Sequence, residues 1–177
     1  MEQRRDYIAY DNTECGSAIW PPPENCCGIL ITDNEGIEKE FIIERRRFPY
    51  WGPGNDTIYY GLFYYDLVNK TEHIIVNTDS INFWVNGRPQ YHPTKDKIFF
   101  RGKFTETPVY FKLHSVEPTG KNFKLVSKDP ISDFSLTPDG KILYVLWKGE
   151  KIDRKQCTIW IMDDDGKNKK QLTFNDY

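Results

Sequence analysis

A repeated pattern constrains the fold of this chain more than any other feature. In each copy an apolar residue stands two positions before a proline, a polar turn follows, and an apolar run rich in strand-forming residues comes next. The copies are PYWGPGNDTIYYGL (49–62), PQYHPTKDKIFFRG (89–102) and DFSLTPDGKILYVL (133–146). The prolines lie 40 and then 45 residues apart. A period of this length indicates that each repeat is one supersecondary unit that stacks on its neighbours.

A hairpin pattern follows the apolar run in each repeat. The segments 109–127 (VYFKLHSVEPTGKNFKLVS) and 157–173 (CTIWIMDDDGKNKKQLT) both consist of two strand-like runs around a Gly-Lys-Asn turn. The segments 28–43 and 63–76 have the same outline. Gly, Asn and Asp adopt the backbone conformations that tight hairpin turns need. Each repeat therefore reads as strand a, turn, strand b, loop, strand c, turn, strand d, which is the pattern of a four-stranded propeller blade.

The predicted second strands are apolar on both faces. ILYVLW (142–147), TIYYGLFYY (57–65) and KIFF (97–100) show no alternation with polar residues. A strand is continuously apolar when both faces of its sheet are covered, as they are between stacked blades. Tyr and Phe are abundant, which also favours strands, and helical periodicity is nearly absent.

The sequence therefore predicts an all-β, β-propeller-like array of about four four-stranded antiparallel blades, of which the first is incomplete. We expect one domain over 1–177. Its repeats are expected at approximately 7–46, 47–86, 87–130 and 131–177.

The last repeat resembles a known one. LTPDGKILYV (136–145), followed by TIWIMDDDGKNKKQLT (158–173), is similar to the TolB-like β-propeller repeat, whose blade has a W-S-P-D-G-K-type turn and a hairpin that ends near Leu-Thr. The two earlier repeats have one more residue between the proline and the strand. The repeats together cover about 8–177, nearly the whole chain. The resemblance implies a protein of the interaction type, in a family whose propellers usually have six or more blades.

Four blades are fewer than the resemblance implies, and three interpretations follow. The chain forms a small or partial ring, two chains pair their open ends into a larger ring, or the sequence is a piece of a longer protein. Open blade ends expose apolar faces and unpaired strand edges. We therefore favour self-association into a homo-oligomer, or a missing partner.

Charge and hydropathy narrow the classes of partner. Lys and Arg number 24 against 26 Asp and Glu, for a net charge of -2, so we expect neither a nucleic-acid nor a membrane partner. No apolar run reaches the roughly 20 residues of a membrane span, and no secretory leader is visible. We expect a cytoplasmic location, or a periplasmic or secreted one if a leader has been removed.

The spacing of the four cysteines is not that of a metal site, and we expect reduced thiols.

Motifs of catalysis are missing from the sequence. It contains no GxSxG, GxGxxG or GxxxxGK[ST] pattern. DDDG (163–166) resembles the start of a calcium-binding loop, but Phe174 stands at the twelfth position, where such a loop has Glu. We therefore interpret DDDG as a turn and expect neither a metal nor another cofactor. Whether the chain is an enzyme stays open, with a non-catalytic role favoured.

The favoured hypothesis is a binding module that presents rim loops and an axial surface to a protein, peptide or glycan. The candidate binding residues are those expected at rims and at the beginnings and ends of the first strands. A basic run before aromatic residues supplies two of them, and a histidine expected near the axial pore supplies another. The set is Arg46, Arg47, Arg88, Tyr91, His92 and Asp133. The alternatives are a propeller hydrolase or lyase, the regulatory propeller of a peptidase, and a structural half-ring completed by self-association.

Overall fold

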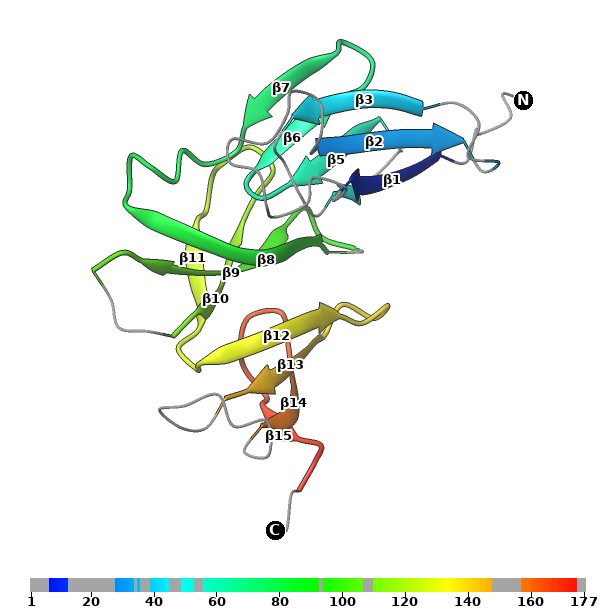
Figure 1. The fold of residues 1–177 in the computed structure, drawn as a ribbon. Coiled ribbons are helices and arrows are strands. Elements are labelled where there is room, and N and C mark those ends of the chain that lie inside the picture. The colour runs from blue at the N-terminus through cyan, green and yellow to red at the C-terminus, as the bar shows by residue number, and fades with distance from the viewer. Residues whose placement is uncertain are drawn as a thin grey trace, which may run out of the picture. The chain divides into compact units, whose positions relative to one another are not determined.

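The structure is a computed structural model, and it describes residues 7–12, 28–33, 35, 39–44, 49–52, 56–92, 94–106, 110–147 and 157–174. These residues form fifteen strands, β1 to β15, and the described part of the chain contains no helix. The strands belong to two compact units, Met1–His73 and Ile74–Tyr177. Within each unit the strands are joined into antiparallel sheets, and most of the strands are labelled in Figure 1.

The first unit contains two sheets. A three-stranded sheet, blade 1, has the order β1-β2-β3, and a four-stranded sheet, blade 2, has the order β4-β5-β6-β7. Their core joins Ile29 and Ile31 of β2 to Ile58 and Tyr60 of β5. The strands are β1 (Tyr7–Asn12), β2 (Gly28–Asp33), β3 (Lys39–Glu44), β4 (Tyr50–Trp51), β5 (Thr57–Tyr60), β6 (Phe63–Asp66) and β7 (Thr71–Ile74).

The second unit contains two four-stranded sheets, blade 3 (β8 to β11) and blade 4 (β12 to β15), each with its strands in sequence order. The strands are β8 (Phe83–Tyr91), β9 (Ile98–Phe104), β10 (Lys112–Val116), β11 (Lys124–Ser127), β12 (Ile131–Leu136), β13 (Ile142–Leu146), β14 (Thr158–Met162) and β15 (Lys170–Gln171). The predicted all-β fold of antiparallel blades, with the first incomplete, is confirmed. Blade 3 begins at Phe83, within the last residues of the predicted repeat 47–86, because β8 is longer than the sequence pattern indicates.

One core holds blades 3 and 4 together. Phe99 of β9 and Leu113 of β10 pack with residues of blade 4, all of them buried. The blade 4 residues are Ile131, Phe134, Ile142, Tyr144 and Met162. Burying side chains of this size contributes about 1.5–3 kcal/mol each, so this face is the main source of stability between the two blades.

The second strands of blades 2, 3 and 4 are β5, β9 and β13. Two of them, β5 and β9, are buried on both faces, as the sequence predicts. Three successive residues of β9, Ile98 to Phe100, are each 0% exposed, so both faces of this strand are covered. Three successive residues of β5, Ile58 to Tyr60, are also buried. In β13, Ile142 and Tyr144 are buried against blade 3, whereas Leu143 and Val145 on the other face are only half-buried. Within the described residues of the second unit there is no further blade to cover that face.

The Gly-Lys-Asn turns have a common structural role. Gly120 and Gly166 have φ of 79° and 85°, a conformation that favours glycine. A Cβ on Gly120 would lie 2.3 Å from the carbonyl oxygen of Ile75, and one on Gly166 would lie 2.1 Å from that of Val126. The turn of blade 3 therefore touches the backbone of Ile75, the turn of blade 4 touches the last strand of blade 3, and only glycine allows either approach.

A side chain joins the first strands of blades 3 and 4. The Gln90 amide nitrogen donates to the carbonyl oxygen of Phe134 (2.9 Å), and its amide oxygen accepts from the backbone N–H of Leu136 (2.9 Å). Gln90 thus occupies backbone groups of β12 in the way that a neighbouring strand would. This bridge and the shared core fix the turns of the two blades relative to each other.

Candidate functional site

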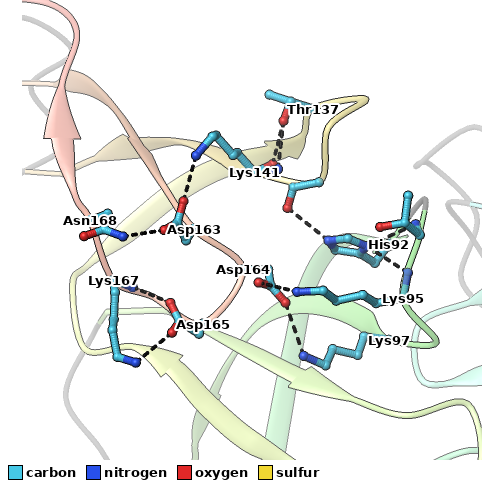
Figure 2. Close-up of polar contacts among 12 residues, drawn as sticks. His92, Lys95, Lys97, Thr137, Lys141, Asp163, Asp164, Asp165, Lys167 and Asn168 are labelled. Atoms are coloured by element: carbon cyan, nitrogen blue, oxygen red, sulfur yellow. Dashed lines mark hydrogen bonds and ion pairs between the residues drawn. The ribbon is translucent and has the colours of Figure 1, made fainter.

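Three turns of the second unit converge on one pocket, which we call the rim pocket. They are the loop between β8 and β9, the turn between β12 and β13, and the turn between β14 and β15 (Figure 2). The pocket has a volume of about 250 Å³. Its lining residues are His92, Thr94, Lys95, Asp139, Gly140, Lys141, Asp163, Asp164 and Asp165.

His92 forms the buried base of this arrangement, with 2% of its surface exposed. Its Nδ1 accepts hydrogen bonds from the backbone N–H groups of Thr94 (3.2 Å) and Lys95 (3.1 Å). Nδ1 therefore carries no proton, and the Nε2–H donates to the carbonyl oxygen of Gly140 at 3.0 Å. Both ring nitrogens are occupied, so His92 orders the loop of blade 3 and ties it to the turn of blade 4.

Asp164 connects the two blades by charge. Its carboxylate lies 2.7 Å from the Lys95 ammonium and 3.2 Å from that of Lys97, and its side chain is 15% exposed. Partial burial alone raises the pKa of Asp164, but the hydrogen bonds and charges of the two lysines outweigh it and the pKa is lowered. Asp164 is therefore ionised at neutral pH, and each of its two carboxylate oxygens pairs with one lysine.

The other carboxylates of the rim pocket are also held in their charged form. The hydrogen bond from Lys141 (2.8 Å) is the largest cause that lowers the pKa of Asp163, and the same pair raises the pKa of Lys141. A hydrogen bond from the Thr137 hydroxyl lowers the pKa of Asp139. Lys167 lowers the pKa of Asp165 in the same way. These groups stay ionised around neutral pH.

The lining of the rim pocket has an excess of negative charge. It includes four aspartates and two lysines, while Lys97 and Lys167, which pair with Asp164 and Asp165, lie outside the lining. The pKa values of the aspartates are lowered and the pKa of Lys141 is raised. Each of these pKa values therefore lies further from neutral pH than the ordinary value of its group. General acid–base catalysis needs a group that titrates near the working pH. The chemistry of these groups is therefore ion pairing and hydrogen bonding.

The predicted binding residues fall into separate places. His92 lies in the rim pocket, and the hydroxyl of the neighbouring Tyr91 donates a hydrogen bond to the Asp96 carboxylate. Arg88 is exposed in β8, within an irregular stretch of that strand. Asp133 is exposed in β12. Arg46 and Arg47 lie outside the described residues.

The sequence patterns did not single out the aspartates and lysines of the rim pocket. DDDG forms the predicted turn, from Asp163 to Gly166, but the pairing of its carboxylates with Lys95 and Lys141 was not anticipated. A signal was present, because the turns of two successive repeats carry lysines and the hairpin turn of the later one carries aspartates. Opposite charges in the turns of adjacent blades predict a contact once the blades are known to stack.

Among the described residues, no group of three or more His, Cys, Asp or Glu side chains is placed to hold a metal ion. Within the same residues, no helix has the length and apolar character that crossing a membrane requires.

Comparison with known proteins supports the fold. No family model matches the sequence, and no curated protein matches it significantly. Among solved structures, TolB from Acinetobacter baumannii is similar, with 20% identity and a TM-score of 0.71 over 95% of this chain and 41% of that one. An oligogalacturonate lyase from Vibrio parahaemolyticus has 12% identity and a TM-score of 0.65 over 83% and 46%. A chain of a nidogen/laminin complex has 11% identity and a TM-score of 0.62 over 97% and 63%.

These similarities show that the chain has a TolB-like β-propeller fold. The chain spans less than two thirds of each of those structures, between 41% and 63% of their lengths. The identities are low, and proteins with this fold bear names as different as TolB, a lyase and nidogen. The fold therefore fits a binding role without specifying the ligand.

Proposed function

We propose that the chain is a non-catalytic protein-binding module whose rim pocket receives a lysine or arginine side chain of its partner. The observation that carries this proposal is the ionised, net negative lining of a pocket that three turns of two blades build together. A chain with a similar fold occurs in a nidogen/laminin complex, which supports protein binding as a use of this scaffold.

A cationic side chain of a partner can replace a lysine in the ion pairs of the rim pocket. The Lys95 and Lys141 side chains that pair with its aspartates are 48% and 47% exposed. Exposed ion pairs contribute only about 0–1 kcal/mol, so little stability is lost when an incoming cation replaces one of them. An arginine is the better competitor because its planar guanidinium donates two parallel hydrogen bonds to a carboxylate.

The alternative of a propeller hydrolase or lyase receives less support from the rim pocket. Such chemistry needs a nitrogen or carboxyl that can exchange a proton, and both nitrogens of His92 already have hydrogen-bond partners. A glycan ligand also receives less support, because sugars usually pack on an exposed Phe, Tyr or Trp ring, and none of the described residues that line this pocket is one of these. The experiment below separates these possibilities.

Asp165→Asn is expected to weaken binding of a blocked arginine peptide, acetyl-GRGRG-amide, by about three- to tenfold. Asp165 lines the pocket, is 43% exposed and, among the described residues, forms its ion pair with the highly exposed Lys167, so we expect its replacement to leave the fold intact. Isothermal titration calorimetry at low and at physiological salt measures the affinity, and binding should weaken as salt rises. Asp79→Asn, an exposed carboxylate outside the rim pocket, is the matched control and should bind like the parent chain.

Two results would contradict the proposal. The first is no saturable binding of the arginine peptide by the parent chain at low salt. The second is equal loss of affinity in Asp165→Asn and Asp79→Asn, which would mean that the affinity depends only on the net charge of the protein. Binding of a neutral oligosaccharide instead, unaffected by Asp165→Asn, would favour a glycan ligand at another surface.

A further inference from the structure

The opposite end of blade 3 carries a surface with the opposite charge. The register of β8 and β9 pairs Tyr91 with Ile98 at the rim pocket end and Phe83 with Phe104 at the other end. Between these ends the pairing is irregular, because five residues of β8, from Asn86 to Gln90, lie opposite three residues of β9. Such bulges re-aim side chains and are common beside functional sites.

An arginine is held against this bulge. The Arg101 Nη2 donates to the Asn86 side-chain oxygen at 2.9 Å. Gly87, with φ of 80°, lies so close that a Cβ would be 2.7 Å from the same Nη2. Partial burial is the largest influence on Arg101 and lowers its pKa, while the charge of Asp133 acts in the opposite direction. The guanidinium is thus ordered and partly desolvated, and within the described residues no carboxylate lies at ion-pair distance from it.

Aromatic rings continue the surface beyond Arg101. Trp84 is 59% exposed, and its ring meets that of Phe111 edge-on at 6.1 Å. The Lys103 ammonium lies 5.6 Å from the centroid of the Trp84 ring and 5.5 Å from that of Phe111. These cation–π contacts hold the lysine over two rings while its charge stays near the surface.

The register places these side chains together on one face. Trp84 pairs with Lys103, and Asn86 pairs with Arg101. Side chains two residues apart on a strand point to the same face, so the two pairs are adjacent. We call this set, with Phe111 added, the basic-aromatic patch. Arg88 lies exposed in the bulge next to it.

We propose that the basic-aromatic patch binds an acidic-aromatic peptide segment, in which a carboxylate side chain stands beside an aromatic one. The carboxylate would accept hydrogen bonds from Arg101, and the aromatic side chain would pack on Trp84. Charge complementarity and the exposed tryptophan together select this occupant. The patch and the rim pocket lie at opposite ends of blade 3 and have opposite charge, so this proposal does not depend on the proposed function.

Two physical features favour a peptide over a larger polyanion. Asp133 contributes a negative charge close enough to act on Arg101, which limits the positive potential that a nucleic acid would need. An exposed tryptophan is among the residues that most often dominate protein–protein affinity.

The test uses NMR titration of the full chain with three blocked peptides, acetyl-GFDFG-amide, acetyl-GFNFG-amide and acetyl-GGDGG-amide. The indole N–H signal of Trp84, assigned by its loss in Trp84→Phe, reports on the patch. We expect GFDFG to shift this signal saturably, with at least about tenfold weaker binding of the peptides that lack the carboxylate or the rings. Arg101→Gln should weaken GFDFG binding by about tenfold, whereas Lys128→Gln, an exposed lysine outside the patch, should not.

Each other outcome overturns the proposal. It fails if GFDFG does not shift the Trp84 signal saturably, if GFNFG binds equally well, or if Arg101→Gln binds like the parent chain. Should Arg101→Gln lose its dispersed NMR spectrum, Lys103→Gln replaces it, with an expected weakening of about threefold. Binding of a short single-stranded oligonucleotide more tightly than GFDFG would assign the patch to nucleic acid instead. The arginine peptide that tests the rim pocket should leave the Trp84 signal unmoved, so failures of the two proposals are distinguishable.

Discussion

Gly166→Ala is expected to destabilise the second unit by about 2–5 kcal/mol, a large fraction of the stability of a domain of this size. Two costs add together. Gly166 has φ of 85°, where a Cβ is strained, and that Cβ would lie 2.1 Å from the backbone oxygen of Val126. A backbone atom of a paired strand cannot move aside cheaply, so the turn would have to separate from blade 3.

Gly61→Ala is the matched control for this prediction. Gly61 has φ of 57°, but the nearest atom to its Cβ would be 3.8 Å away. Only the conformational cost applies there, and we expect about 1–2 kcal/mol. Urea unfolding followed by circular dichroism measures both variants. Equal destabilisation by the two substitutions would show that the hairpin turn of blade 4 does not abut blade 3.

Acidification from pH 6.5 to about pH 4 is expected to remove about 3 kcal/mol of stability through His114. This ring is buried among Phe83, Phe100 and Phe123, and burial is the largest cause that lowers its pKa from 6.5 to about 4. Between these pH values the unfolded chain binds a proton that the folded chain does not. The contribution is therefore complete above pH 6.5 and is lost as the pH falls toward 4, at about 1.4 kcal/mol for each pKa unit.

His114→Phe separates this effect from the titration of carboxylates. Phenylalanine keeps the ring in the aromatic cluster but loses the hydrogen bond between Nδ1 and the carbonyl oxygen of Lys112, at a cost of about 1 kcal/mol at pH 7. The free energy of unfolding at pH 7 and pH 4.5, from urea titrations, is the measurement. We expect a clearly smaller loss on acidification in the variant, and an unchanged loss would assign the acid sensitivity to other groups.

Much of the fold could be predicted because the repeats carry the same residue types at matching positions, and these positions are buried in each blade. Ile58 and Tyr60, Ile98 and Phe100, and Ile142 and Tyr144 occupy matching positions of the second strands, and all six are buried. Alternate residues of those strands are apolar too, which indicated stacked sheets. One detail differs, because TIYYGLFYY is interrupted at Gly61 by a tight turn between β5 and β6.

The candidate surfaces were harder to predict for a physical reason. Asp164 and Lys97 are 67 positions apart in the sequence, and their contact depends on how blade 4 sits on blade 3. His92 was expected to serve a ligand, yet its position between two turns uses both ring nitrogens for internal hydrogen bonds. The cluster around Arg101 depends on the bulge in β8, whose register the sequence pattern does not specify.

The rim pocket exists only if blades 3 and 4 pack face to face, because turns of both blades build it. A double-mutant cycle of Phe99→Leu and Ile142→Val tests this packing, because both side chains are fully buried in the shared core. Urea unfolding of the two single variants and the double variant gives the interaction energy. We expect about 0.5 kcal/mol or more for side chains in one core. Additivity within about 0.3 kcal/mol, the behaviour of distant and independent sites, would contradict the packing and the rim pocket derived from it.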